Sequence, residues 1–216
     1  MKDETTKKHW DNIYANKQPD EVSWTQEYPK ASLDLIRGLE LPKHARIIDV
    51  GGGDSRLADH LLDEGYKDIT VLDISGMALK RAQKRLGEQA GYVHWIVADV
   101  TEFVAEKAFD LWHDRATFHF MTTPAKISAY LKRAKHAIKI NGYMTLGTFS
   151  EKGPDICSGL EVKQYTEESL REQVENGFRK ITCVTEDHRT PFNTLQNFLF
   201  CSFKRHTIRK GQAITP

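Results

Sequence analysis

Residues 47–55 read IIDVGGGDS, a run of apolar and acidic residues that leads directly into three glycines. The run has the composition of a buried strand, and apolar residues recur at helical spacing after the glycines. Glycine adopts positive φ and lets another group approach the backbone closely. The stretch therefore predicts a strand, a bare turn and a helix, with a ligand lying against the turn.

Similar apolar runs recur along the chain and set the expected fold class. Helical patterns separate five such runs, which are ARIIDV (45–50), ITVLDI (69–74), VHWIVAD (93–99), FDLWHD (109–114) and GYMTLGTF (142–149). This alternation is typical of parallel βαβ units with helices on both faces of the sheet. Two later runs without room for a helix between them predict an antiparallel hairpin, namely KITCVTEDH (180–188) and NFLFCSFKR (197–205). We therefore expect an α/β protein with a Rossmann-like, mostly parallel sheet of seven strands that ends in a C-terminal antiparallel hairpin.

Length, charge and cysteine content exclude several classes of protein. The 216 residues suffice for one α/β domain, and no linker or repeat divides them. Lys and Arg number 31 against 30 for Asp and Glu, which argues against a nucleic-acid-binding surface. No apolar run is long enough to cross a bilayer and no signal-peptide core is present, so we expect a cytoplasmic protein that binds no membrane. Cys157, Cys183 and Cys201 form no CxxC pair, which favours reduced thiols and no metal site. A monomer is the default expectation.

A dinucleotide is the first ligand to test against the glycine turn. Its fingerprint is GxGxxG, in which the third glycine lets the helix pack closely on the strand. Aligned on Gly51 and Gly53, that third glycine falls at Arg56. The dinucleotide fingerprint therefore fails.

Acidic residues at three successive strand ends indicate a different ligand. Asp73 follows Gly53 by 20 residues, and its carboxylate can accept hydrogen bonds from both hydroxyls of a ribose. Asp99 follows the next strand and can accept from the exocyclic amine of an adenine. Together with Asp49, these acids suit a ligand that has a ribose, an adenine and a positive charge, and they suit a pyrophosphate poorly.

The order of these motifs resembles a class I S-adenosylmethionine-dependent methyltransferase over about residues 45–205. The residues that carry the resemblance are IIDVGGGDS, VLDIS, ADV, FDLWHDRATFHF and GYMTLGTF. The family pattern DxGxGxG reads DVGGGDS here, so Ser55 replaces the third glycine. HWDNIYANKQPDEVSWTQ (9–26) and GPDICSGLEVKQYT (153–166) resemble a narrower subgroup. That subgroup includes bacterial members of unassigned substrate and is similar to lysine methyltransferases acting on citrate synthase and elongation factor.

The resemblance implies a single domain, residues 1–216, with S-adenosyl-L-methionine as cofactor and S-adenosyl-L-homocysteine as product. Residues 1–44 would be a helical lid and substrate segment, 45–205 the cofactor-binding core and 206–216 a frayed tail. The glycines would back the methionine part, Asp73 would hold the ribose and Asp99 the adenine edge, while Asp49 would act indirectly. For each acid, a helix cap is the alternative role. The cofactor residues expected are Asp49, Gly51, Gly52, Gly53, Asp73, Ile74, Asp99, Val100, His113 and Trp24.

The candidate catalytic residues are His119, Asp114 and Arg115, which follow or end the strand at 109–114. His119 has the chemistry of a proton acceptor near neutral pH, although a histidine between two phenylalanines is often simply packed. Asp114 would help to close over the methionine part of the cofactor, or form a buried pair with Arg115. Arg115 in turn would form that pair or clamp a carboxylate.

Two further segments are expected at the mouth of the site. Trp10, Tyr14, Trp24 and Tyr28 would cover the cofactor or pack in the core, and aromatic faces attract a sulfonium or a methylated ammonium. The loop at 147–166 leaves the fifth strand at the same edge and is expected to shape the acceptor site. Its Cys157 is expected to be a partly buried thiol rather than a nucleophile.

The expected function is methyl transfer by in-line displacement, with a small molecule or a protein lysine as acceptor. The absence of an Asn-Pro-Pro-Tyr type of sequence after 109–114 counts against the exocyclic amines of DNA or glutamine. One alternative is a non-catalytic binding or scaffold protein, which would have degraded cofactor positions. A nicotinamide-dependent oxidoreductase is a second alternative, disfavoured by Arg56 and by the antiparallel end of the sheet.

Overall fold

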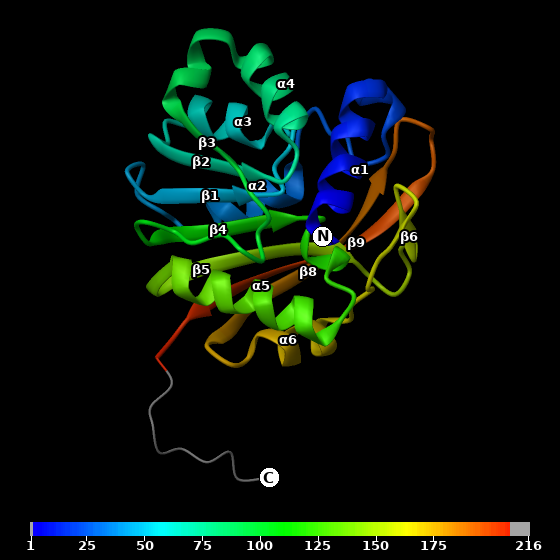
Figure 1. The fold of residues 1–216 in the computed structure, drawn as a ribbon. Coiled ribbons are helices and arrows are strands. Elements are labelled where there is room, and N and C mark those ends of the chain that lie inside the picture. The colour runs from blue at the N-terminus through cyan, green and yellow to red at the C-terminus, as the bar shows by residue number, and fades with distance from the viewer. Residues whose placement is uncertain (1, 208–216) are drawn as a thin grey trace.

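The computed structural model describes residues 2–207, and one seven-stranded sheet with the order β3-β2-β1-β4-β5-β9-β8 forms its centre (Figure 1). β1 pairs in parallel with β2 and β4, β2 with β3, and β4 with β5. β9 runs antiparallel to β5 and to β8. The predicted sheet and its C-terminal hairpin are confirmed. The strands are β1 Arg46–Val50, β2 Asp68–Asp73, β3 Val93–Val97, β4 Phe109–Arg115, β5 Ile138–Phe149, β8 Phe178–Arg189 and β9 Leu195–Arg205.

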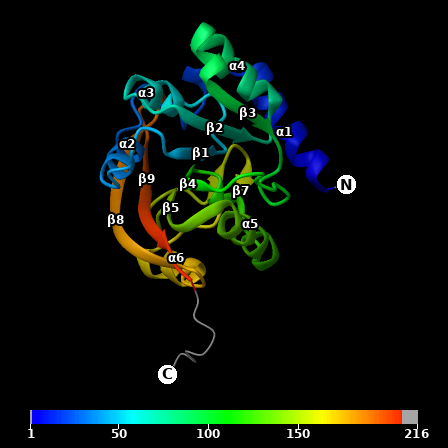
Figure 2. The same cartoon turned by 90° about the vertical axis from the view of Figure 1, so that its left-hand side faces the viewer.

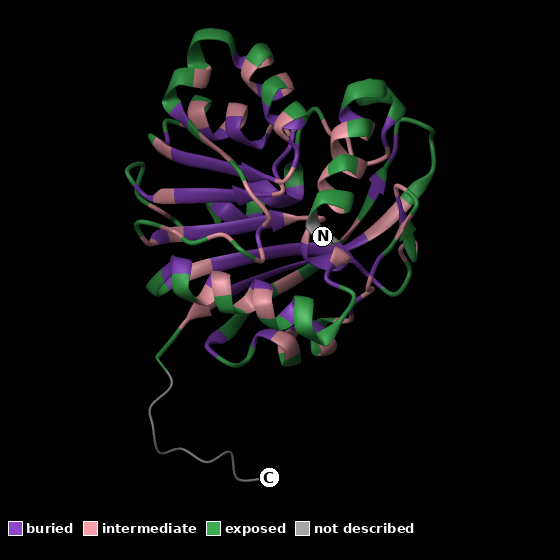
Figure 3. Cartoon of the chain, viewed as in Figure 1, coloured by how far each residue is buried: buried purple, intermediate pink, exposed green. Residues whose placement is uncertain are grey.

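Helices cover both faces of the sheet, as expected from strands that are apolar on both sides. α2 (Lys30–Arg37), α3 (Leu57–Asp63) and α4 (Gly76–Leu86) share one core cluster, and α5 (Pro124–Ala137) and α6 (Glu167–Val174) share another (Figure 2). Ile47 of β1 belongs to the first cluster and Ile48 to the second, which is the two-residue period of a strand. Figure 3 shows the central strands buried along most of their length. Within residues 2–207, no helix is both long and apolar enough to cross a membrane.

The strand order reverses between β1 and β4, where α/β proteins bind their ligands. α1 (Lys2–Asn16) lies across the strand ends on this side and packs against α4 (Figure 1). The loop after β5 carries a small hairpin that was not predicted, formed by β6 (Ile156–Cys157) and β7 (Leu160–Glu161). Three 3-10 helices complete the described elements: Pro19–Glu21, Gly87–Tyr92 and Phe118–Phe120. Of the tail expected to fray, 208–216 lie outside the described residues.

Two of the three cysteines are joined, so the expectation of reduced thiols is wrong for them. Cys183 and Cys201 form a disulfide across β8 and β9, with a Cα–Cα distance of 4.1 Å, whereas Cys157 is free and buried. The register of the hairpin places Cys183 directly opposite Cys201. Counting residues outward from the turn between the two strands would have placed the two cysteines opposite each other. Their separation along the chain alone does not show this pairing. Disulfides persist mainly in oxidising compartments, so the cysteines no longer support a cytoplasmic protein.

Candidate active site

A cavity is lined by residues at the carboxyl ends of β1, β2 and β4 and just after β3, and by residues of α1 and the segment that follows it. Of the residues predicted from the sequence, its wall contains Asp49, Gly51, Gly52, Asp73, Ile74, Asp99, Val100, His113, Arg115 and Trp24. The wall does not include three other predicted residues that the structure describes, Gly53, Asp114 and His119. The structure thus brings most of the expected cofactor residues together and separates two of the three expected catalytic residues from them.

The glycine loop is shaped by contacts with the protein itself. Gly51 and Gly53 have φ angles of +65° and +51°, which non-glycine residues rarely adopt. A Cβ at Gly51 would overlap Oγ1 of Thr117, and a Cβ at Gly53 would lie 2.6 Å from the hydroxyl oxygen of Tyr14. Both glycines are therefore required by backbone conformation and by their neighbours, before any ligand is considered.

Arg85 holds this loop in place, and sequence reasoning missed it. Its guanidinium donates to the carbonyl oxygens of Asp54 at 2.6 Å and Ser55 at 2.8 Å, and to the carboxylate of Asp59 at 2.9 and 2.8 Å. Arg85 belongs to α4, where a basic residue on the polar side of a helix looks like a solvated side chain. Only the packing of α4 beside the glycine loop reveals that Arg85 ties the helix to the loop.

Asp73 ends β2 with its carboxylate buried at the cavity. Its Oδ1 accepts a hydrogen bond from the backbone N–H of Ser75 at 2.7 Å, and the backbone N–H of Gly53 donates to the same carboxylate. Burial raises the pKa of Asp73 to about 7, although these two hydrogen bonds oppose the shift. The carboxylate therefore links the glycine loop to the start of α4, where Ser75 is the helix cap.

Asp99 lies two residues beyond the end of β3 and lines the same cavity. Its Oδ1 accepts from the backbone N–H of Thr101 at 2.7 Å and from the Thr101 hydroxyl at 2.6 Å. One oxygen of the carboxylate thus fixes the turn after β3. This is the local structural role that was the alternative to ligand binding, and it leaves the other oxygen for a ligand.

Asp49 and His113 face each other across β1 and β4. Oδ1 of Asp49 lies 4.0 Å from Nε2 of His113, whose Nδ1 is 2.7 Å from the Thr145 hydroxyl. Burial lowers the pKa of His113 to about 3, so the imidazole is neutral at physiological pH. Burial also raises the pKa of Asp49 to about 8, with the nearby carboxylate of Asp114 adding to the shift. A cation in this cavity would stabilise the ionised form of Asp49.

Arg115, at the end of β4, places a cation in the same cavity. Its Nη2 donates to the carbonyl oxygen of Trp24 at 2.7 Å, and its guanidinium lies 5.7 Å from the ring centre of Phe198. The buried Nε has no hydrogen-bond partner among the described residues, and the expected pair with Asp114 does not form. Burial lowers the pKa of Arg115 to about 10, so the side chain still carries its charge at neutral pH.

Asp114 points to the opposite face of the sheet. Its Oδ1 accepts from the backbone N–H groups of Thr117 at 2.9 Å and Phe118 at 3.2 Å, and its Oδ2 accepts from the Tyr130 hydroxyl on α5. Side chains alternate along a strand, so Asp114 faces away from its neighbours His113 and Arg115. In this position the carboxylate supports the turn after β4.

His119 is packed in the core. Its ring lies between Phe120 and Phe149, with centroid distances of 4.5 and 4.6 Å. Burial lowers its pKa to about 3, and the backbone N–H of Phe149 lies 3.4 Å from its Nδ1. This environment corresponds to the packed histidine that was the alternative to a catalytic base.

α1 is attached to α4, beside the cavity, by polar contacts that the sequence did not reveal. Asp11 accepts from the Ser75 hydroxyl at 2.7 Å and from the backbone N–H of Met77 at 3.5 Å, so it sits at the start of α4. A negative side chain at a helix N-terminus is stabilising. Arg81 of α4 donates to the carbonyl oxygen of Lys17. α1 is thereby held over the strand ends.

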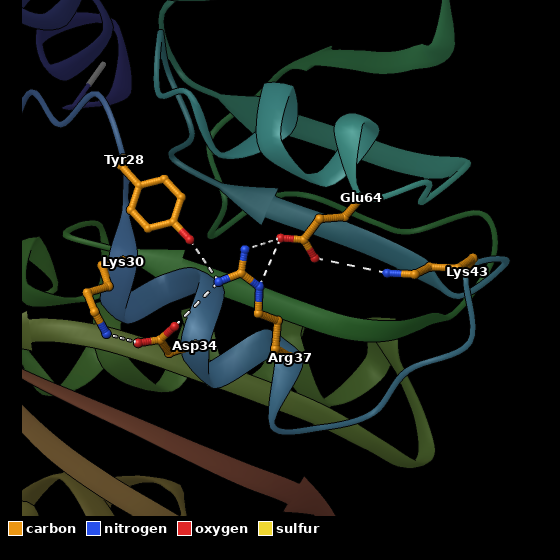
Figure 4. Close-up of polar contacts among 6 residues, drawn as sticks. All are labelled: Tyr28, Lys30, Asp34, Arg37, Lys43 and Glu64. Atoms are coloured by element: carbon orange, nitrogen blue, oxygen red, sulfur yellow. Dashed lines mark hydrogen bonds and ion pairs between the residues drawn. The ribbon is translucent and has the colours of Figure 1, made fainter.

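Aromatic residues from α1, the following segment and the 3-10 helix after β4 form one wall of the cavity. The ring of Trp10 lies 6.5 Å from Tyr14, 5.8 Å from Trp24 and 5.3 Å from Phe120. All four residues line the cavity, as Cys157 also does. Tyr28 lies elsewhere: its hydroxyl accepts from Arg37 on the outer surface of α2, as Figure 4 shows. It belongs neither to the cavity wall nor to the core.

Comparison with known proteins supports the same family. A methyltransferase-domain model matches residues 47–142. Malonyl-[acyl-carrier protein] O-methyltransferase of Anoxybacillus flavithermus is 28% identical over 56% of this chain. The matched region covers 47% of that protein, so the chain spans about half of its length. The structure superposes on a protein that was solved in a study of the conversion of a disulfide bond into a thioacetal group during echinomycin biosynthesis. The TM-score is 0.76, the identity is 18%, and the alignment covers 93% of both chains.

The N-methyltransferase NodS of Bradyrhizobium japonicum, solved in complex with S-adenosylhomocysteine, superposes with a TM-score of 0.71. The identity is 15%, and the alignment covers 93% of this chain and 98% of NodS. The fold, the matched domain and the resemblance in the motifs agree. Residues 47–142 match a methyltransferase domain, and the chain has the fold and the motifs of the class I S-adenosylmethionine-dependent methyltransferases.

Proposed function

We propose that this protein transfers a methyl group from S-adenosyl-L-methionine to an acceptor bound in the same cavity. The observation that carries the proposal is the arrangement of Asp49, Asp73 and Asp99 around one cavity beside the glycine loop. Burial destabilises the ionised forms of Asp49 and Asp73, so a ligand that brings hydroxyl donors and a positive charge would relieve this cost. S-adenosylhomocysteine bound to NodS supports the same class of ligand here.

Each group at the cavity is assigned a part in binding. Asp73 would accept hydrogen bonds from the ribose hydroxyls, with Ile74 against the adenine, and Asp99 with Val100 would bind the adenine edge. The backbone of Gly51 and Gly52, which lines the cavity, would lie beside the methionine part. Asp49, His113 and Trp24 would surround the charged end, where the aromatic wall attracts cations.

The protein's contribution to the reaction would be alignment and exclusion of water. S-adenosyl-L-methionine supplies an electrophilic methyl group, which the acceptor atom attacks in line. The walls formed by α1 and the β4 end would hold the acceptor in this alignment and keep the site dry. Asp114 and His119 lie outside the cavity wall, so the proposal assigns no proton transfer to them. Both a small molecule and a protein lysine are acceptors that this mechanism accommodates.

Calorimetric titration tests the proposal with three ligands: S-adenosyl-L-methionine, S-adenosyl-L-homocysteine and NADH. We expect micromolar binding of the first two and none of the third. Binding of NADH alone would favour the oxidoreductase, and a folded sample that binds neither adenosyl ligand would refute the methyltransferase. Transfer of a labelled methyl group to small thiols, amines, acids or proteins of a cell extract then separates an enzyme from a non-catalytic binding protein.

A further inference from the structure

Arg115 carries a charge for which the described part of the protein supplies no paired anion. The ion pairs among residues 2–207 do not include Arg115, although the carboxylates of Asp49 and Glu186 are close enough to act on it electrostatically. Its hydrogen bond to the Trp24 carbonyl satisfies one N–H, while the buried Nε has no partner. A guanidinium has five N–H donors arranged to bind a carboxylate with two parallel hydrogen bonds. The side chain is therefore oriented and charged, and it has N–H groups available to bind an anionic ligand.

The position of Arg115 along the sheet separates it from Asp73, Asp99 and the glycine loop. In the order β3-β2-β1-β4-β5, Asp99 follows β3, Asp73 ends β2 and the glycine loop follows β1. Arg115 ends β4, and its guanidinium lies over Phe198 of β9, on the far side of β5. A ligand that extends from Asp99 to the glycine loop would leave Arg115 beyond its end, next to the loop after β5.

The wall next to Arg115 is apolar and aromatic. Trp24 accepts from Arg115 through its carbonyl and contacts the ring of Trp10, which in turn contacts Phe120. These rings and Met121 line the cavity together with Arg115. Such surroundings suit a ligand with an apolar body, and they strengthen any charge pair because water is excluded.

We infer that the methyl acceptor is a small organic acid, whose carboxylate binds the guanidinium of Arg115 and whose apolar body lies against Trp10, Trp24 and Phe120. The inference rests on the proposed methyltransferase function and narrows its acceptor. A protein lysine would bring a second cation close to Arg115, which is unfavourable in a site with little water. Arg115 is thus assigned as a residue that selects and orients the acceptor.

The test compares carboxylates with their uncharged amides on protein saturated with S-adenosyl-L-homocysteine. The probes are benzoate, phenylacetate and 3-phenylpropanoate, each paired with its primary amide, and binding is followed by calorimetry. We expect at least one carboxylate to bind about tenfold or more tightly than its amide, as a charged bidentate pair would give. In Arg115→Gln this preference should fall to near one. If no carboxylate is preferred by the wild-type protein, the inference is wrong.

Two variants control the test. Arg56→Gln removes another cation of the cavity wall, one already paired with Glu27 at 3.0 Å, and should keep the carboxylate preference. Arg115→Lys keeps a positive charge and should retain part of the carboxylate preference. This variant separates loss of the cation from loss of folding. Melting temperatures are measured for all variants.

The affinity for S-adenosyl-L-homocysteine distinguishes the possible sources of the carboxylate, since that ligand also carries one. We expect Arg115→Gln to leave this affinity within about threefold. A loss greater than tenfold in a variant with an unchanged melting temperature would mean that Arg115 binds the cofactor, and the acceptor inference would be overturned. Wild-type protein that binds no S-adenosyl-L-homocysteine at all would instead refute the proposed function.

Discussion

The cavity has a proposed cofactor side, at the ends of β1 to β3, and a proposed acceptor side, at the end of β4, and the two are assembled differently. On the cofactor side, Asp49, Asp73 and Asp99 each come from a strand end or the residues just after it. On the acceptor side, Arg115 meets Trp24 and Phe198, which are distant in sequence. The acids of the first side come from short local segments at strand ends, and the contacts of Arg115 on the second side depend on how distant parts of the chain pack.

This difference predicts different responses to mutation. Changes on the cofactor side should weaken the binding of S-adenosyl-L-homocysteine, and changes on the acceptor side should alter the preference for acceptors. Thr117 and Tyr14 connect the two sides, because they pack on Gly51 and Gly53 of the glycine loop. A variant at this junction offers the most severe test.

Gly51→Ala is expected to have the largest effect. The added Cβ would overlap Thr117, and φ of +65° is unfavourable for alanine. Together, strain and overpacking should lower the free energy of unfolding by about 3 kcal/mol or more, which corresponds to roughly 10 °C in Tm. Thermal unfolding measures the loss. The control is Gly65→Ala, where φ is +86° but the space is open, so about 1 kcal/mol is expected. Equal losses in both variants would show that the contact with Thr117 is unimportant.

Asp73→Ala should reduce the affinity for S-adenosyl-L-homocysteine by about 100-fold, because two hydrogen bonds to a charged group would be lost. Calorimetry measures the change. Asp68→Ala removes an acid from the other end of the same strand, where Asp68 pairs with Arg46 at 3.0 Å, and should leave binding unchanged. If Asp73→Ala binds normally, the division of the cavity into a cofactor side and an acceptor side fails.

The sequence predicted the cofactor side better than the acceptor side for a physical reason. Strand ends and glycine turns are local features, and parallel strands align their carboxyl ends, so Asp49 and Asp73 were placed correctly at the cavity. Alternation along β4 would also have separated Asp114 from Arg115, had it been applied. The ties made by Arg85 had no such local signal, because they depend on the packing of α4 against the glycine loop.

Arg85→Met tests whether the cofactor side is held in shape by α4. The loss of hydrogen bonds to the carbonyl oxygens of Asp54 and Ser55 should loosen the glycine loop and weaken S-adenosyl-L-homocysteine binding by about tenfold. The acceptor preference for a carboxylate should survive at saturating S-adenosyl-L-homocysteine. Lys84→Met, at the exposed neighbouring position, is the control and should bind normally. Loss of the carboxylate preference in Arg85→Met would mean that the two sides are not separable.

The pH dependence of binding gives the smallest expected effect and tests Asp49, which lies where the two sides meet. Its pKa of about 8 means that it is mostly protonated at pH 6.5 and mostly ionised above pH 8.5. Both ligands carry an α-ammonium group, but S-adenosyl-L-methionine also carries a sulfonium charge, so the ratio of the two affinities isolates the effect of ionised Asp49 on the sulfonium. A bound cation is stabilised by the ionised carboxylate of Asp49. The affinity of S-adenosyl-L-methionine relative to that of S-adenosyl-L-homocysteine should therefore rise by about fivefold from pH 6.5 to pH 8.5. Calorimetry of both ligands at each pH gives this ratio, and Asp49→Asn should make it independent of pH. A ratio that stays constant in the wild-type protein would show that the sulfonium is not bound near Asp49. The sulfonium would then be assigned to the aromatic wall of Trp10 and Trp24.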